Sequence, residues 1–176
     1  MNKAELGKQI YDISNIKGDF LLRSGIRATE YFDKYLFEAN PVILREIANH
    51  MVGLLPVQFD QLAGLEMGGI PIATALSLEI ERPALFVRKE AKEYGTCKLA
   101  EGGEIKGQEL VIIEDVVTSG GAILDAVREL RARGATVKHV CCVIDREGTG
   151  RENLEAENLT FSPLFTKSEL ETLATS

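Results

Sequence analysis

The sequence predicts an α/β protein with a mostly parallel central sheet, helices on both faces of the sheet, and a small N-terminal hood. Short apolar runs typical of buried strands alternate with helical patterns along the chain, which is the order expected for a parallel sheet. The 176 residues suffice for one domain with a substantial core. Their apolar content of 45% is ordinary for a globular protein. We therefore expect a single domain over residues 1–176.

The N-terminal part, about residues 1–40, is predicted to form the hood. Apolar residues recur at helical spacing over 4–13, which predicts an amphipathic helix there. Residues 18–35 mix polar and apolar side chains and are expected to form a hairpin or an extended hood. Asn40 followed by Pro41 is typical of a helix start, an N-cap with proline at the first helical position.

Five later apolar runs are predicted to be strands. They are residues 61–65, 84–87, 110–113, 137–144 and 160–164. Helices are predicted over 70–78 and 122–133, and Gly134 is a typical stop for the second of them. Thr166 and Glu169 have the spacing of a capping box and predict a short final helix.

Composition and charge exclude several classes of protein. The net charge of -7 argues against nucleic acid as the main partner. No apolar run approaches the length of a membrane span, and charges interrupt the N-terminus where a signal peptide needs an apolar stretch, so we expect a cytoplasmic protein without a membrane partner. Cys141 and Cys142 lie in an apolar run and are expected to be core thiols. His50 and His139 are isolated, which does not suit a metal site.

A segment rich in chemistry runs from Glu109 to Val127. An apolar run ends in two adjacent acids, Glu114 and Asp115, and a polar, glycine-rich turn precedes a helix. Free N–H groups at a helix start attract phosphate, and glycine lets the backbone approach it closely. The two acids suit ribose hydroxyls or a hydrated Mg²⁺. A plain strand–turn–helix connection is the alternative, but two like charges side by side favour a sugar-phosphate site.

Polar residues also follow the other predicted strands. Residues 66–69 follow the first strand and fit either a phosphate-binding turn or an ordinary tight turn, with neither preferred. Arg88 and Lys89 follow the second strand, and Asp145 and Arg146 follow the fourth. Ligands of parallel sheets bind outside the carboxyl ends of the strands, so these groups are expected to converge on one site.

Residues 89–106 have no helical or strand pattern and are predicted to form a flexible catalytic loop. A basic cluster at its start comprises Arg88, Lys89, Lys92 and Lys98, diluted by two glutamates. Such a loop can close over a polyphosphate and neutralise its charge. The alternative is an ordinary solvated charged loop.

Four residues are candidates for a second part of the site. Arg146 suits a carboxylate, although a surface pair with Asp145 is the simpler reading of that residue alone. Arg23, Tyr31 and Phe32 offer a cation and ring faces to a flat anionic ligand, or the two aromatic residues are simply core of the hood.

These motifs resemble those of the type I phosphoribosyltransferases. IIEDVVTSGGA is similar to the family's signature for phosphoribosyl pyrophosphate (PRPP). RKEAKEYGT and DREGTG resemble segments of its orotate-specific members, and the resemblance covers residues 18–150. It implies the type I phosphoribosyltransferase fold and transfer of the phosphoribosyl group from PRPP to orotate, a step of pyrimidine biosynthesis that yields orotidine 5′-monophosphate and pyrophosphate.

The resemblance also implies residue roles. The residues implied to bind PRPP are Arg88, Lys89, Lys92, Tyr94, Glu114, Asp115, Val116, Val117, Thr118, Ser119, Gly120, Gly121 and Ala122. Catalytic roles are implied for Lys92, Asp115 and Glu114. The residues implied to bind orotate are Thr118, Arg146, Arg23, Tyr31 and Phe32.

The same resemblance implies Mg²⁺ held mainly by PRPP, without a direct protein ligand. It also implies a homodimer in which loop residues reach the neighbouring site. Three positions depart from the family's common pattern. Gly68 stands where lysine is frequent, Tyr94 where many members have histidine, and Cys97 where a basic residue is frequent.

Two other functions fit the sequence. One is a phosphoribosyltransferase for a purine or another pyrimidine, which would not need the Arg146 cation. The other is a PRPP-binding regulator without catalysis, which would be expected to carry a basic nucleic-acid surface.

Overall fold

A mostly parallel sheet forms the centre of the molecule. The structure is a computed structural model that describes residues 1–21, 25–89 and 99–175. The strands of this sheet, within those ranges, are β3 (Gln61–Leu65), β4 (Ala84–Val87), β5 (Ala100–Glu101), β6 (Glu109–Val117), β7 (Thr136–Asp145) and β8 (Thr160–Thr166). They lie in the order β5-β4-β3-β6-β7-β8, and every neighbouring pair is parallel except β4 and β5. The predicted fold class is confirmed.

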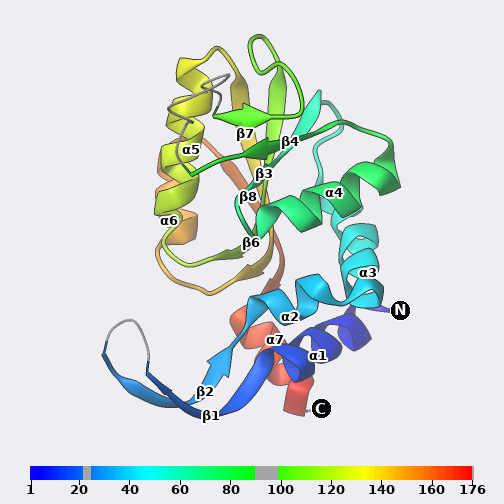
Figure 1. The fold of residues 1–176 in the computed structure, drawn as a ribbon, viewed down its shortest axis with the longest axis vertical. Helices are drawn as coiled ribbons and strands as arrows, with labels where there is room; N and C mark the ends of the chain where they lie inside the picture. Colours follow the sequence, from blue (N-terminus) through cyan, green and yellow to red (C-terminus); the bar gives the residue numbers. More distant parts are fainter. Residues whose placement is uncertain (22–24, 90–98, 176) are drawn as a thin grey trace.

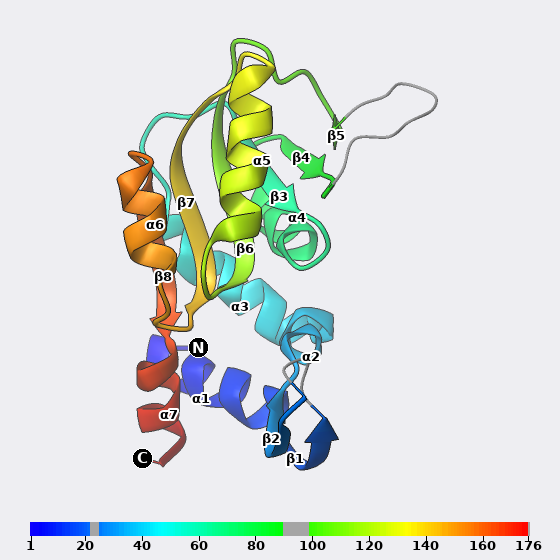
Figure 2. The same cartoon turned by 90° about the vertical axis from the view of Figure 1, so that its left-hand side faces the viewer.

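Helices cover both faces of the sheet. Helices α3 (Pro41–Met51) and α4 (Gly69–Ile80) lie on one face, and α5 (Gly121–Ala132) and α6 (Gly150–Ala156) lie on the other (Figures 1 and 2). Because successive side chains of a strand point to opposite faces, each strand supplies two cores. In β6, Ile113 packs into the core beneath α3 and α4, whereas Ile112 packs into the core beneath α5.

The N-terminal part stands at one end of the sheet. Helix α1 (Lys3–Ser14) leads into an antiparallel hairpin of β1 (Asn15–Leu21) and β2 (Arg27–Phe32), which projects away from the sheet (Figure 1). Helix α2 (Lys34–Ala39) follows, and the C-terminal helix α7 (Lys167–Thr175) packs beside α1. The expected hood is therefore a hairpin between two helices. No helix in the described ranges is both long and apolar enough to cross a bilayer.

The predicted helix caps are confirmed. The Asn40 side chain accepts hydrogen bonds from the backbone N–H groups of Val42 and Ile43 at 3.0 and 3.2 Å. Thr166 and Glu169 form the expected capping box, with Thr166 N donating to Glu169 Oε2 at 2.7 Å and Glu169 N donating to Thr166 Oγ1 at 3.2 Å. These local bonds satisfy N–H groups that a helix start leaves free.

Several elements differ from the sequence-based expectations. Strand β6 continues to Val117 instead of ending at Ile113, so the two adjacent acids lie within the strand. Helices α2 and α6 were not predicted, because each is a short segment without a clear helical period. Within the expected loop 89–106, residues 90–98 lie outside the described residues, and β5 pairs with β4 because Leu99 and Ala100 are buried against the core.

Candidate active site

The glycine-rich turn leads from β6 into the first turn of α5. Gly120 has φ 73°, in the left-handed region where a side chain would be strained, and it provides no side chain to cap the helix. Thr118 and Ser119 are exposed beside it. No side chain caps the start of α5 by the usual criterion, and the Gly121 N–H has only a long contact of 3.5 Å to Ser119 Oγ, which suits the anion site that the sequence predicts.

Hydrogen bonds hold this turn against the segment that follows β7. The Arg146 N–H donates to Val117 O at 2.8 Å, and the Gly150 N–H donates to Thr118 O at 2.9 Å. The Asn153 side chain donates to Ser119 O at 2.9 Å. The predicted phosphate turn and the predicted carboxylate-binding arginine thus belong to one connected unit.

A cavity of about 460 Å³ lies at the carboxyl ends of β3, β4 and β6, beside the start of α5. It is lined by Leu65, Glu66, Val87, Arg88, Lys89, Glu114, Gly121, Ala122, Asp125 and Ala126. Five of these residues, from two separate segments of the sequence, were predicted to bind PRPP. The predicted convergence at the ends of the strands is therefore observed for them.

Glu66 holds the backbone of Lys89 at the edge of this cavity. Its carboxylate accepts a hydrogen bond from the Lys89 N–H at 2.5 Å. The Arg88 guanidinium lies 3.8 Å from the Glu101 carboxylate, and its Nε is buried without a hydrogen-bond partner among the described residues. A polyphosphate in the cavity would give these cations strong acceptors. Glu66 was noticed in the sequence only as part of a turn of uncertain role.

The two adjacent acids of β6 have different surroundings. Glu114 lines the cavity, whereas the Asp115 side chain is fully buried and forms an ion pair with Lys34 of α2 at 2.5 Å. Burial opposes ionisation of Asp115, but hydrogen bonds with Glu114, Lys34 and Glu38 outweigh it and hold the pKa of Asp115 below its usual value. Burial and the hydrogen bond with Asp115 raise the pKa of Glu114 well above its usual range. Asp115 is therefore the acid that carries the negative charge.

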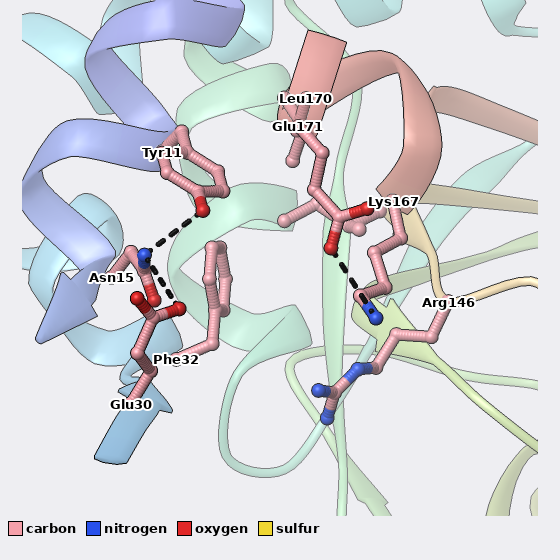
Figure 3. A pocket seen from close by; sticks show the side chains of 9 residues that line it. Tyr11, Asn15, Glu30, Phe32, Arg146, Lys167, Leu170 and Glu171 are labelled. Carbon is pink, nitrogen blue, oxygen red and sulfur yellow. Dashed lines mark hydrogen bonds and ion pairs between the residues drawn. The ribbon is translucent and has the colours of Figure 1, made fainter. Parts of the chain in front are cut away.

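A second pocket, of about 200 Å³, lies between the hairpin, the end of β7 and helix α7. Arg146 and Phe32, both predicted to bind the base, line it together (Figure 3). Opposite Arg146, Asn15 donates hydrogen bonds to Tyr11 Oη at 2.9 Å and to Glu30 at 3.3 Å. The pocket therefore combines two aromatic residues, Tyr11 and Phe32, with the Arg146 guanidinium and a polar wall. The wall also contains charged side chains, those of Glu30, Lys167 and Glu171.

Arg146 does not pair with its neighbour Asp145. The Asp145 carboxylate accepts a hydrogen bond from Glu147 N at 2.8 Å and lies 3.7 Å from the Arg151 guanidinium. Among the described residues no ion pair engages the exposed Arg146 side chain, so its charge faces the pocket. The simpler interpretation of Arg146 as a partner of Asp145 is wrong.

The remaining predicted residues are placed as follows. Tyr31 is 45% exposed and packs on Phe20 with ring centroids 5.5 Å apart, so it does not line the pocket with Phe32. Arg23, Lys92 and Tyr94 lie outside the described residues. Sequence reasoning missed Lys34 and Glu38, because the fold alone brings α2 against β6.

The comparisons with known proteins agree with this geometry. Residues 37–162 match the model of the phosphoribosyl transferase domain. An orotate phosphoribosyltransferase of a Nocardioides species is 55% identical, over 96% of this chain and 94% of its own length. The chain belongs to the orotate phosphoribosyltransferase family. A member from Methanocella arvoryzae is 45% identical over 87% of each chain.

Solved structures of the family have the same fold. The Mycobacterium tuberculosis orotate phosphoribosyltransferase in complex with PRPP superposes with a TM-score of 0.83 at 28% identity, covering 96% of this chain and 98% of that one. The predicted family and its fold are confirmed. Within the described residues, no group of three or more histidine, cysteine or acidic side chains could hold a metal ion.

Proposed function

We propose that the protein transfers the 5-phosphoribosyl group from PRPP to orotate, giving orotidine 5′-monophosphate and pyrophosphate. The proposal is supported by the high identity to proteins of that name over nearly their full length. The observation that carries it is the cavity at the strand ends, where Arg88, Lys89 and Glu114 meet the start of α5. Arg146 next to that cavity's turn supplies the feature specific to a carboxylated base.

PRPP is proposed to bind with its 5′-phosphate on the turn of residues 118–122. Exposed backbone N–H groups there suit a phosphate, and Gly121 leaves its approach open. Val116 and Val117 lead the strand into this turn. Glu114, which lines the cavity, is proposed to hold the ribose hydroxyls, with Asp115 beside it.

The pyrophosphate is proposed to lie against Arg88 and Lys89, which line the cavity. Lys92 and Tyr94 are proposed to join them, by resemblance to the family. In the transfer, the bond between C1 of the ribose and the pyrophosphate oxygen breaks, and the oxygen keeps the electron pair. The cations stabilise the charge that grows on this leaving group. The N1 atom of orotate, which is proposed to be deprotonated already when orotate binds, forms the new bond to C1 from the opposite face with its own electron pair.

Mg²⁺ is the proposed cofactor. It prefers phosphate oxygens and keeps several of its waters, so PRPP oxygens would be its main ligands and Glu114 would hold its waters. When bound, it adds positive charge at the pyrophosphate. This arrangement fits a cavity that presents three acids, Glu66, Glu114 and Asp125, beside two basic side chains.

Orotate is proposed to bind with its carboxylate on Arg146 and its ring on Phe32. A guanidinium can donate two parallel hydrogen bonds to a carboxylate, and a neutral purine has no carboxylate to accept them. Thr118 lies in the turn beside Arg146 and is proposed to contact the base. Contacts of Arg23 and Tyr31 with orotate are proposed from the family resemblance alone.

We further propose a homodimer in the cytoplasm, with Lys89 and the residues after it reaching the neighbouring subunit's site. Several apolar side chains on the surface would suit such an interface, among them Leu78, which is 80% exposed. Sedimentation velocity tests the dimer, and mixing two inactive variants altered in different parts of the site tests the shared site. Recovery of activity on mixing supports it.

The reaction is tested by following orotate absorbance with purified protein, PRPP and Mg²⁺, with adenine, hypoxanthine and uracil in parallel. Consumption of orotate that requires both PRPP and Mg²⁺ is expected. If another base reacts and orotate does not, the protein is a phosphoribosyltransferase with a different base as its substrate. If PRPP binds but no base is converted, the result would favour the alternative function of a PRPP-binding regulator without catalysis.

A further inference from the structure

Lys34 reaches from helix α2 to strand β6 and forms an ion pair inside the protein. Its Nζ lies 2.5 Å from Asp115 Oδ2, and its own side chain is 34% exposed, whereas that of Asp115 is fully buried. A buried carboxylate that loses its partner is strongly disfavoured, in contrast to a surface pair. The contact therefore connects the N-terminal part to the strand that also carries Glu114.

The Asp115 carboxylate is enclosed by three elements. Its Oδ1 accepts a hydrogen bond from the Val116 N–H at 2.6 Å. The backbone at Gly68, before α4, lies so close that a Cβ there would be 1.7 Å from Asp115 Oδ2. Glu38 of α2, only 6% exposed, adds a hydrogen bond from a second carboxyl group. With water excluded, Lys34 is the cation that neutralises Asp115 among the described residues.

Three carboxyl groups share this one ammonium group. Burial, followed by the hydrogen bond with Asp115, raises the pKa of Glu38 to about 9. The pKa of Glu114 is raised by the same two causes. Protons on Glu38 and Glu114 leave a single negative charge on Asp115, which matches the single positive charge of Lys34. Other titratable groups that act on these four are Asp33, Tyr35 and, on β7, Cys142.

Asp115 is joined to Glu114 in turn. The Asp115 N–H donates to Glu114 Oε1 at 3.1 Å, and the two side chains share a hydrogen bond. Lys34 itself is not among the residues that line the cavity. Lys34 therefore acts on a ligand in this cavity from a distance, mainly through its ion pair with Asp115 and to a smaller extent through its charge acting on Glu114.

We propose that Lys34 is a positioning residue for the transfer reaction: it keeps Asp115 charged and in place, and Asp115 orients Glu114 toward PRPP. This inference rests on the proposed function. If the Lys34 charge is removed, Asp115 is left buried without a counter-ion and takes up a proton. The hydrogen bond that orients Glu114 then changes, and the ribose hydroxyls lose a correctly placed acceptor.

The test compares Lys34→Met with Lys34→Arg. Lys34→Met keeps most of the side chain without its charge, and we expect the KM for PRPP to rise about tenfold or more near neutral pH, with the KM for orotate changed less than about twofold. Raising the pH should restore the KM for PRPP, because Asp115 then loses its proton again. Lys34→Arg keeps the charge and should recover most of the loss. Lys138→Met, in an exposed lysine of β7 that pairs with Glu109 at the start of β6, is the matched control and should behave as wild type.

Two results would overturn the proposal. One is a Lys34→Met variant with the wild-type KM for PRPP at every pH. The other is a loss that is independent of pH and equal in Lys34→Arg, which would be a purely structural effect. If circular dichroism shows Lys34→Met unfolded, the double variant Lys34→Met/Asp115→Asn is compared with Asp115→Asn. Equal KM values for PRPP support the proposal, and a further increase in the double variant contradicts it.

The proposed function is tested separately by wild-type turnover of orotate. If the wild type does not convert orotate, PRPP affinity measured by calorimetry replaces KM in the same set of variants. A weaker PRPP affinity in Lys34→Met that Lys34→Arg recovers would then support the inference about Lys34, and an unchanged affinity would contradict it, whichever base the enzyme uses.

Discussion

The backbone at Gly68 lies directly against the carboxylate of Asp115. A Cβ at position 68 would come within 1.7 Å of Asp115 Oδ2, far inside van der Waals contact. Position 68 therefore has to be glycine in this arrangement. The close approach helps to seal the carboxylate that Lys34 neutralises.

Gly68→Ala is expected to destabilise the protein, because the methyl group displaces either the turn or Asp115. Overpacking of this kind costs about 1–3 kcal/mol, which corresponds to a lower Tm by about 2–4 °C per kcal/mol in a chain of this length. Thermal unfolding followed by circular dichroism measures the change. Gly53→Ala is the control, since a Cβ at Gly53 would meet no atom within 4 Å. Equal Tm values for the two variants would contradict the prediction.

Gly121→Ala should separate PRPP binding from folding. A Cβ at Gly121 has open space, with Ser119 Oγ the nearest atom at 3.7 Å, so the Tm should stay within about 2 °C of the wild-type value. The same methyl group would enter the space proposed for the 5′-phosphate. We expect the KM for PRPP to rise about tenfold, as measured by initial rates at saturating orotate. An unchanged KM would place the phosphate elsewhere.

Arg146→Ala should weaken orotate binding selectively. Loss of a charge-assisted hydrogen bond to the carboxylate costs about 1.5–3 kcal/mol, so the KM for orotate should rise roughly 10- to 100-fold. The KM for PRPP should change little. Arg133→Ala, which removes an ion pair with Glu129 at the C-terminal end of α5, is the matched control. Equal increases in both KM values for Arg146→Ala would argue against a specific contact with the base.

The charge cluster around Asp115 predicts a pH dependence of stability. Burial and the hydrogen bond with Asp115 raise the pKa of Glu38 from 4.5 to about 9, so the folded protein holds a proton that the unfolded chain releases. The free energy of unfolding contributed by Glu38 is complete below about pH 4.5 and is lost as the pH rises through about 9. Glu38→Gln keeps a neutral side chain and removes this titration.

Urea unfolding at a series of pH values between about 5 and about 9 tests the prediction. The wild type should lose more stability over this range than Glu38→Gln does. Glu152→Gln, in an exposed position of α6, should follow the wild type. Parallel curves for the wild type and Glu38→Gln would show that Glu38 titrates normally.

Much of this protein follows from local patterns in the sequence. Alternation of apolar strand runs with helical periods determined the fold class, because a parallel sheet needs a crossover between its strands. Asn40 before Pro41, and Thr166 with Glu169, located two helix starts, since the bonds of a helix cap form within a few residues. The rule that ligands bind at the carboxyl ends of parallel strands predicted that Arg88 and Glu114 lie at one site, and both line the cavity.

The tertiary structure alone decided how these residues act. Glu114 and Asp115 are neighbours with the same charge in the sequence, yet one lines the cavity and the other is buried against α2, because a strand turns successive side chains to opposite faces. The partner of Asp115 is Lys34, which lies far away along the chain on a helix too short to be recognised by its period. Arg146 is available to a ligand because the folded chain pairs Asp145 with Arg151 instead. The partner of each charged side chain depends on which segments pack together, and that packing is a property of the whole fold.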